Sequence, residues 1–117
     1  MEYYSDGKIK FEGEYLNGNK LNGKIYDLKK DLYYDLEKIN GLFKEYNYYG
    51  ELEFEGEYIN GIRNGKGKEF KDDNELKFEG EYLNGKRNGK GKEYNSNGDL
   101  LFEGEYSNGE RKLQNKI

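Results

Sequence analysis

The chain has 117 residues, of which 38% are charged and 32% hydrophobic, and its formal net charge is −4. It contains no Cys and no His, which excludes disulfide bonds, thiolate metal sites and the commonest catalytic bases and nucleophiles. A net negative charge gives no general attraction to nucleic acid. We therefore expect one non-enzymatic domain with no metal, no cofactor and no nucleic-acid partner.

The aromatic residues indicate that the chain folds, although its charge content resembles that of disordered proteins. They make up 16% of the sequence and fall at regular positions. No apolar run approaches the ~20 residues needed to span a bilayer, and the N-terminus lacks the apolar core of a signal peptide. We therefore predict a folded protein in the cytoplasm.

A repeated pentapeptide organises the chain. Residues 2–11 align without a gap with residues 93–102, so the chain begins part-way through a repeat unit. The last three copies of FEGEY begin 24 residues apart (78 − 54 = 24; 102 − 78 = 24). A fixed period of this size predicts a repeat array, in which each unit buries its apolar face against its neighbours. The four copies are Phe11–Tyr15, Phe54–Tyr58, Phe78–Tyr82 and Phe102–Tyr106.

Each FEGEY copy lies in a segment that alternates between apolar and charged residues. In the second copy, glutamates separate Leu52, Phe54, Gly56 and Tyr58. A period of two predicts a β-strand with rings on one face and carboxylates on the other. The central Gly leaves room for a ring.

Residues 19–41 interrupt this period. We interpret Leu32–Glu37 as a degenerate first strand, with Tyr33 in the position of the Phe; a short helix over residues 27–38 is the alternative. Asn40-Gly41 restores the phase, since 64 − 40 = 24.

Pairs of Asn-Gly dipeptides punctuate the repeats. Asn and Gly tolerate positive φ, which the type I′ turns of β-hairpins require. We interpret each NGxxNG as the loop of a hairpin, followed by a second strand at 42–46, 66–70 or 90–94. Phe70 lies three residues after Gly67, so in a regular strand the two would face opposite sides of the sheet. Either a β-bulge intervenes, or Phe70, Tyr94 and Tyr46 face the opposite side of the sheet.

The segment FEGEYLNGKRNGKGKEY at Phe78–Tyr94 resembles the membrane occupation and recognition nexus (MORN) repeat. Phe78, Gly80 and Tyr82 match the aromatic-x-Gly-x-aromatic start of that pattern. Asn84-Gly85 and the Gly-x-Gly of residues 89–91 match its loop and its second strand. Tyr82 stands where the family usually has Trp, and Gly41-Leu42-Phe43 resembles a variant class with Gly-x-aromatic second strands.

The resemblance implies an all-β fold, a single-layer, twisted antiparallel sheet of consecutive β-hairpins with about ten short strands. We expect the array to cover residues 1–110 and a tail without repeat signal, a candidate for disorder, to cover residues 111–117. The array divides into a partial unit at 1–10, irregular units at 11–53, regular units at 54–77 and 78–101, and a partial unit at 102–110.

The aromatic stripe is the candidate partner-binding site. A Tyr ring can pack while its hydroxyl reaches a ligand, and a strip of rings suits an extended or helical partner segment. Internal packing of the same rings is the alternative. The predicted partner-binding residues are Tyr15, Phe54, Tyr58, Phe78, Tyr82, Phe102 and Tyr106.

Basic residues recur around the loops and form a candidate phosphate-binding site, with a solvated loop as the alternative. These residues are Arg63, Lys86, Arg87 and Lys90.

From the resemblance we expect a non-catalytic scaffold or adaptor that binds a partner peptide or helix along an aromatic-lined groove. The alternatives are binding of phosphoinositide or acidic phospholipid at a membrane surface, and an antitoxin or immunity-type regulatory role. The open end strands predict a homodimer through an edge strand, with Phe102–Tyr106 as the expected edge.

Overall fold

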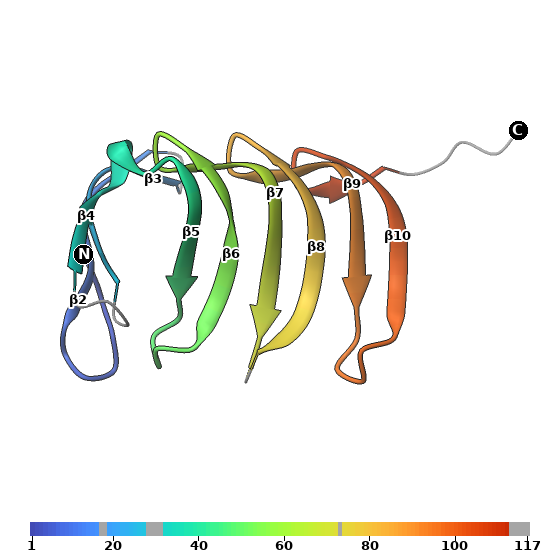
Figure 1. The fold of residues 1–117 in the computed structure, drawn as a ribbon, viewed down its shortest axis with the longest axis horizontal. Helices are drawn as coiled ribbons and strands as arrows, with labels where there is room; N and C mark the ends of the chain where they lie inside the picture. Colours follow the sequence, from blue (N-terminus) through green and yellow to red (C-terminus); the bar gives the residue numbers. More distant parts are fainter. Residues whose placement is uncertain (17–18, 28–31, 73, 113–117) are drawn as a thin grey trace, which may run out of the picture.

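The computed structural model describes residues 1–16, 19–27, 32–72 and 74–112. It confirms an all-β array of consecutive antiparallel hairpins (Figure 1). The described elements are β1 (Glu2–Tyr3), β2 (Ile9–Leu16), β3 (Asn19–Asp27), β4 (Leu32–Asp35), the 3-10 helix η1 (Leu36–Lys38), β5 (Gly41–Tyr46), β6 (Leu52–Ile59), β7 (Ile62–Lys71), β8 (Glu75–Leu83), β9 (Lys86–Tyr94), β10 (Leu100–Ser107) and β11 (Glu110–Arg111).

The strands pair in two sheets that share one hydrophobic core. The first has the order β1-β2-β3-β4 and the second the order β11-β10-β9-β8-β7-β6-β5. Strand pairing stops between β4 and β5 because η1 takes the chain out of the extended conformation between them. The apolar cluster continues across this junction, where the rings of Tyr34 and Phe43 lie 5.4 Å apart.

The irregular region contains the predicted strand, but not with the predicted core residue. β4 confirms extended structure at Leu32–Asp35, and the following residues form one 3-10 turn. Tyr33 is 57% exposed, whereas Leu36 is 4% exposed and joins the core. The 3-10 turn directs the side chain of Leu36 into the core. Leu36, and not Tyr33, is therefore the buried residue of this segment. Residues 28–31 of the predicted helix alternative lie outside the described part.

Only the first Asn-Gly of each NGxxNG motif forms the hairpin turn. Asn60 and Gly61 have φ values of 50° and 80°, and Ile59 pairs with Ile62 across them. The second pair lies inside β7, where Gly65 has a φ of 107°. Two residues suffice for the turn, so the second pair forms a bulge instead of the predicted longer loop.

A second bulge reverses the face of the residues that precede each FEGEY. Glu69 pairs with Phe78 and Phe70 with Leu76, which leaves Lys77 unopposed. Phe70 therefore lies on the face opposite to Phe78, which is the second of the two interpretations; β7 is regular from Gly67 to Phe70, and the bulge lies on β8 at Lys77. Leu76 joins Phe70 on that face, which corrects its predicted place beside Phe78.

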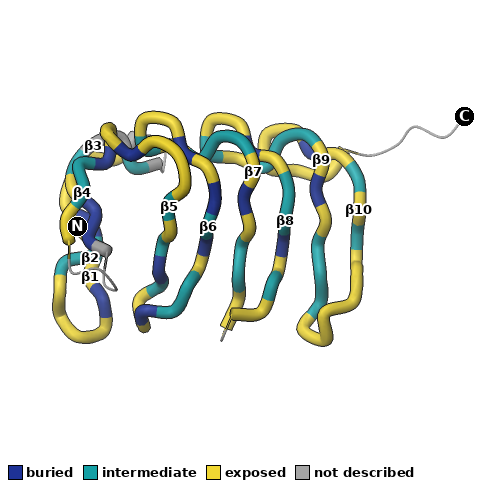
Figure 2. Tube along the Cα trace, viewed as in Figure 1, coloured by how far each residue is buried: buried dark blue, intermediate teal, exposed yellow. Residues whose placement is uncertain are grey.

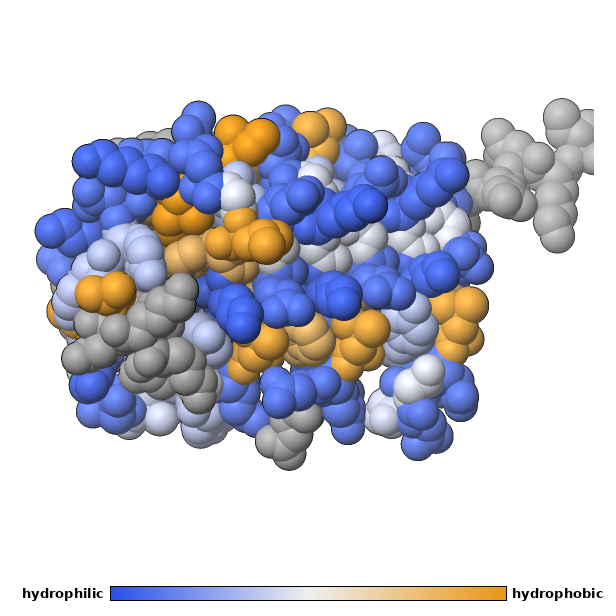
Figure 3. Space-filling model, in the orientation of Figure 1, coloured by the Kyte–Doolittle hydropathy of each residue, from blue (hydrophilic) through white to orange (hydrophobic). Residues whose placement is uncertain are grey.

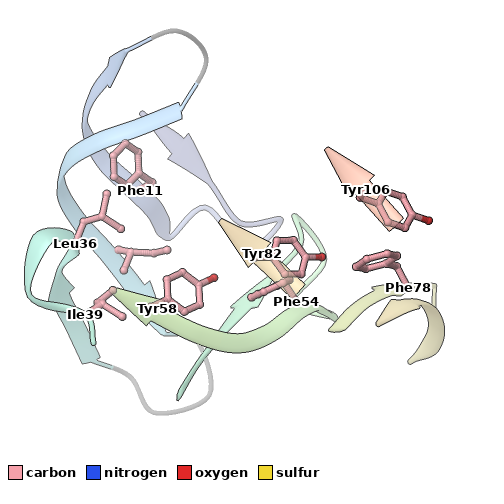
Figure 4. Packing of buried hydrophobic residues seen from close by; sticks show 9 residues of the cluster. Phe11, Leu36, Ile39, Phe54, Tyr58, Phe78, Tyr82 and Tyr106 are labelled. Atoms are coloured by element: carbon pink, nitrogen blue, oxygen red, sulfur yellow. The ribbon is translucent and has the colours of Figure 1, made fainter. Parts of the chain in front are cut away.

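The rings of the FEGEY strands pack on paired glycines. Gly56 lies opposite Gly67 across β6 and β7, and the fully buried ring of Phe54 covers both. This ring stands edge-on between Tyr58, with centroids 5.7 Å apart, and Tyr82 of the next unit, at 5.1 Å. Figure 4 shows these rings continuing toward Tyr106, and Figure 2 shows buried positions recurring on neighbouring strands.

We expect Gly67→Ala to lower the free energy of unfolding by about 1–3 kcal/mol, the usual cost of overpacking. An added Cβ would lie 2.5 Å from Cζ of Phe54 and 3.0 Å from Cε1 of Tyr82. Gly104→Ala is the matched control. It meets only Phe102, a half-buried ring at the end of the array that has room to move, so its cost should be smaller. Urea denaturation measures both, and equal costs would contradict the packing argument.

Candidate interaction groove

A charged pair covers each buried Phe ring. The guanidinium carbon of Arg63 lies 3.8 Å from the ring centroid of Phe54. Its Nε donates a hydrogen bond of 3.0 Å to Oε2 of Glu45. The hydroxyl of Tyr58 donates to the same carboxylate oxygen. A cation over a ring face is attracted by the ring quadrupole, and here the cation is also held in place by a carboxylate.

This ring–cation module recurs along the array. Arg87 stacks 4.0 Å from the centroid of Phe78, and its Nε and Nη2 donate to the two oxygens of Glu69 at 2.9 and 3.0 Å. The first module has Lys in place of Arg. The four sets are Glu2, Phe11, Tyr15 and Lys20; Glu45, Phe54, Tyr58 and Arg63; Glu69, Phe78, Tyr82 and Arg87; and Glu93, Phe102, Tyr106 and Arg111.

Hydrogen bonds within the modules shift the pKa values of their members. Hydrogen bonding from Arg111 lowers the pKa of Glu93 from 4.5 to about 2, against the opposing effect of burial. Burial would raise the pKa of Glu69, but hydrogen bonds from Arg87 and Tyr82 outweigh it and the net shift is downward. Burial, with the hydrogen bond to Glu69, raises the pKa of Tyr82. Glu69 and Glu93 are therefore held ionised and Tyr82 neutral.

The predicted aromatic residues lie in these modules instead of lining an open groove. Phe54, Tyr58, Phe78, Tyr82 and Tyr106 are each 4% exposed or less. Phe102 is half-buried, and Tyr15 is exposed at 44% but donates its hydroxyl to Glu2. The structure thus favours the packing alternative for the buried rings, and their predicted contact with a partner stays a prediction.

The predicted phosphate-binding residues do not form one site. The guanidinium groups of Arg63 and Arg87 are bonded within the modules, while Lys86 and Lys90 are exposed on β9. The sequence analysis missed one regular spacing. In each module with an arginine, the Arg follows the Glu that binds it by 18 residues. The same spacing joins Glu2 to Lys20, so the repeat alignment contained this signal.

The opposite face of the second sheet holds an open groove of about 1430 Å³. Its lining includes five lysines and five glutamates, and its glycines are those under the Phe rings on the other side. Figure 3 shows hydrophilic bands on both sides of a pale strip across strands β6–β10. We call this surface the charged groove, and it is lined by residues 42–44, Tyr46, Leu52, Glu55, Gly56, 66–68, 79–81, 90–92 and 103–105.

Charges in the groove alternate in sign from strand to strand. β7 presents Lys66 and Lys68 around a glycine, and β8 presents Glu79 and Glu81 around its own. β9 repeats the lysines and β10 the glutamates, each strand paired with one of opposite sign. Because alternate residues of a strand share a face, β7, β8, β9 and β10 each contribute a stripe of two like charges, and β6 contributes Glu55 alone.

The groove has an apolar end at β5. Leu42 is 84% exposed and stands where the later second strands have a lysine. Tyr46 and Leu52 continue the lining there, whereas the ring of Phe43 packs against Tyr58 on the other face. Tyr46 and Leu52 also pack with Tyr4 and Tyr26 of the first sheet, which fixes this end of the groove.

Two other kinds of site are absent from the described residues. They contain no group of three or more acidic side chains placed to hold a metal ion. No helix in the described ranges has the length and apolar composition needed to cross a bilayer.

Comparison with known families agrees with this geometry. The family model for the MORN repeat matches residues 54–75, 78–100 and 102–112. The chain belongs to the MORN repeat family. No curated protein and no solved structure matches it.

Membership in the MORN family indicates the general class of function. MORN repeats are generally involved in interactions with proteins or membranes, and the repeat is a non-enzymatic module. The third match runs to residue 112 and so includes Arg111. The repeat contacts therefore reach into the segment that we assigned to the tail; its residues 113–117 lie outside the described part.

Acid should destabilise the array through the modules. An unfolded Glu takes up a proton near its ordinary pKa of 4.5, whereas folded Glu93 does so only near 2. The unfolded state binds more protons in this window, so stability present above pH 4.5 is lost as the pH falls toward 2.

We expect Glu93→Gln to reduce the loss of stability between pH 4.5 and pH 2. The free energy of unfolding, measured by urea denaturation from pH 2 to pH 6, should depend less on pH in the variant than in the wild type. Glu12→Gln changes a carboxylate outside the modules and serves as the control. A Glu93→Gln profile parallel to the wild type would show that the module does not retain its charge in the folded state.

Proposed function

We propose that this MORN protein is a non-catalytic scaffold or adaptor that holds a segment of a partner protein in the charged groove. The observation that carries the proposal is an open groove whose lysines are exposed to solvent. Lys66, Lys68 and Lys90 line it and are exposed, and Leu42 adds an apolar contact at one end.

The groove is a better candidate than the aromatic face because the rings of that face are already covered. A partner that contacted Phe54 would have to displace Arg63, which would break its hydrogen bond to Glu45 and leave a half-buried carboxylate without its cation. The lining of the groove requires no such rearrangement.

A protein partner fits the charge of the groove better than a membrane does. An anionic bilayer attracts basic residues, but the lining carries as many glutamates as lysines. The glutamates would repel the headgroups that the lysines attract. A protein segment can present both signs of charge in the required order.

The predicted homodimer edge remains a proposal of the same kind. β11 pairs with Tyr106 and Ser107 of β10, and the amide of Lys112 donates to the carbonyl of Glu105 at 2.8 Å. The remainder of β10 has no outer neighbour among the described strands, and unpaired edges favour strand addition. We likewise retain the cytoplasm as the proposed location.

Charge reversal in the groove should abolish partner capture. We expect Lys68→Glu to place a carboxylate between Glu55 and Glu79 in one row of the groove and to reduce retention of the partner about tenfold or more in pull-downs from the native cell. Lys71→Glu makes the same change on the same strand, at an exposed residue outside the groove lining, and should leave capture unchanged.

Thermal unfolding monitored by circular dichroism checks that both variants remain folded. A partner that binds wild type, Lys68→Glu and Lys71→Glu equally would remove the groove as its site.

A further inference from the structure

We infer that the segment held in the charged groove is an α-helix whose charge changes sign at every turn. The inference rests on the proposed function and adds the conformation and charge order of the partner. It follows from the alternation of stripes across β6–β10: acidic, basic, acidic, basic, acidic.

Both residues of a stripe carry the same sign. Lys66 and Lys68 flank a glycine on β7, as Lys90 and Lys92 do on β9. A partner that crosses the strands meets two like charges on one strand and two opposite charges on the next. The sign therefore alternates with the spacing of the strands in both rows from β7 to β10, and Glu55 extends the row of Lys68 to β6.

The spacing of the stripes matches the pitch of a helix. Neighbouring strands lie about 4.8 Å apart, so the four intervals from β6 to β10 cover about 19 Å. Four helical turns advance about 22 Å. This length differs from that of the four strand intervals by less than one strand spacing, so each turn stays over its stripe. In an extended chain, residues on one face recur about every 6.7 Å, and four such steps cover about 27 Å. The extended chain falls out of phase with the stripes by more than one strand.

Tilting the partner does not rescue an extended chain. A tilt of roughly 45° would match 6.7 Å steps to the strands, but the chain would then drift about 18 Å along them over four intervals. The two rows of charges lie only about 7 Å apart, since they are separated by two residues on each strand. A helix needs a tilt of roughly 25–30° and drifts about 10 Å, which its own width of about 10 Å covers.

The charges are available to a partner. Within the part of the groove that the structure describes, the only ion pair between two lining residues joins Lys92 to Glu103 at 3.7 Å, and both side chains remain exposed, at 45% and 60%. Glu79 accepts one hydrogen bond from the hydroxyl of Tyr94 at 2.6 Å, and Glu81 accepts one from the amide of Lys90 at 2.6 Å. These bonds fix the carboxylates without neutralising them.

A second copy of this chain fits the groove less well. Two grooves related by a two-fold axis between β7 and β8 would oppose stripes of opposite sign. The same axis would place Glu105 of one copy over Leu42 of the other, although Glu103 would face Lys44. Burying carboxylates against leucine is costly, whereas a helix can present an apolar residue there.

Synthetic peptides test the inference on the full chain. The probe is an 18-residue helical peptide with a leucine at one end and pairs of Lys and Glu that alternate turn by turn on one face. A second peptide of the same composition gathers Lys in one half and Glu in the other, and a third carries a central proline in the alternating sequence. Fluorescence anisotropy at low salt measures their affinities.

We expect the alternating peptide to bind at least about tenfold more tightly than either of the other two. Equal affinity for the alternating and the segregated peptide would overturn the charge order. Equal affinity for the alternating and the proline-containing peptide would overturn the helix, and no measurable binding of any peptide would overturn both.

Exchanging charges between the protein and the peptide tests whether the peptide binds to the stripes. Lys66→Glu with Lys68→Glu should weaken the alternating peptide about tenfold or more, and exchanging Glu for Lys in the facing turn of the peptide should restore binding. Failure of this rescue would contradict the inference. Light scattering that detects a dimer dissociated by the same two changes would identify a second copy as the occupant and overturn the helix.

Failure of the peptides alone leaves the proposed function standing if Lys68→Glu still abolishes capture of the native partner. Unchanged capture by Lys68→Glu removes the proposed function itself.

Discussion

The structure depends on one interaction, a phenylalanine ring laid over two glycines that face each other on neighbouring strands. A single-layer sheet has no second layer to bury its rings. Phe54 instead reaches full burial between the backbone at Gly56 and Gly67 and the guanidinium of Arg63. Any Cβ at the glycines would occupy the place of the ring. The covering arginine needs a carboxylate to hold it, and Glu45 supplies that carboxylate from the strand before. The repeated Phe, paired Gly, Arg and Glu of a module are thus all required by the burial of one ring.

The same interaction gives the two faces of the sheet different roles. The ring face is committed to stability, because its polar groups are bonded inside the modules. The lysines of the opposite face are exposed, so they can change without loss of packing. Leu42 shows this freedom, since it replaces a lysine of the later second strands and is the most exposed large hydrophobic residue described. The repeat constrains the proposed recognition in the charged groove mainly by fixing the spacing of its charges.

The sequence predicted the elements because their determinants are local. Alternation marks the FEGEY strands, and positive φ at Asn60 and Gly61 is what an Asn-Gly turn provides. It did not predict which face is open. Lys77 is a one-residue bulge that moves Leu76 to the other side of the sheet, with no trace in composition. The cover of Phe54 also comes from residues that are distant in sequence, Glu45 and Arg63. Without that cover the rings look accessible, and the aromatic stripe was therefore assigned to a partner.

The ends of the array differ in a way that links binding to stability. At β5 the groove is tied to the first sheet, since Tyr46 and Leu52 pack with Tyr4 and Tyr26. At β10 the last ring, Phe102, has Tyr106 as its one aromatic contact, where Phe54 and Phe78 have two each. In a repeat array each unit is held by its neighbours, so the last unit is the least stable. A partner that spans β5–β10 would contact this weak unit and the anchored one at once. Its binding free energy would then add to the stability of the last repeat, since only the ordered array presents the complete series of stripes.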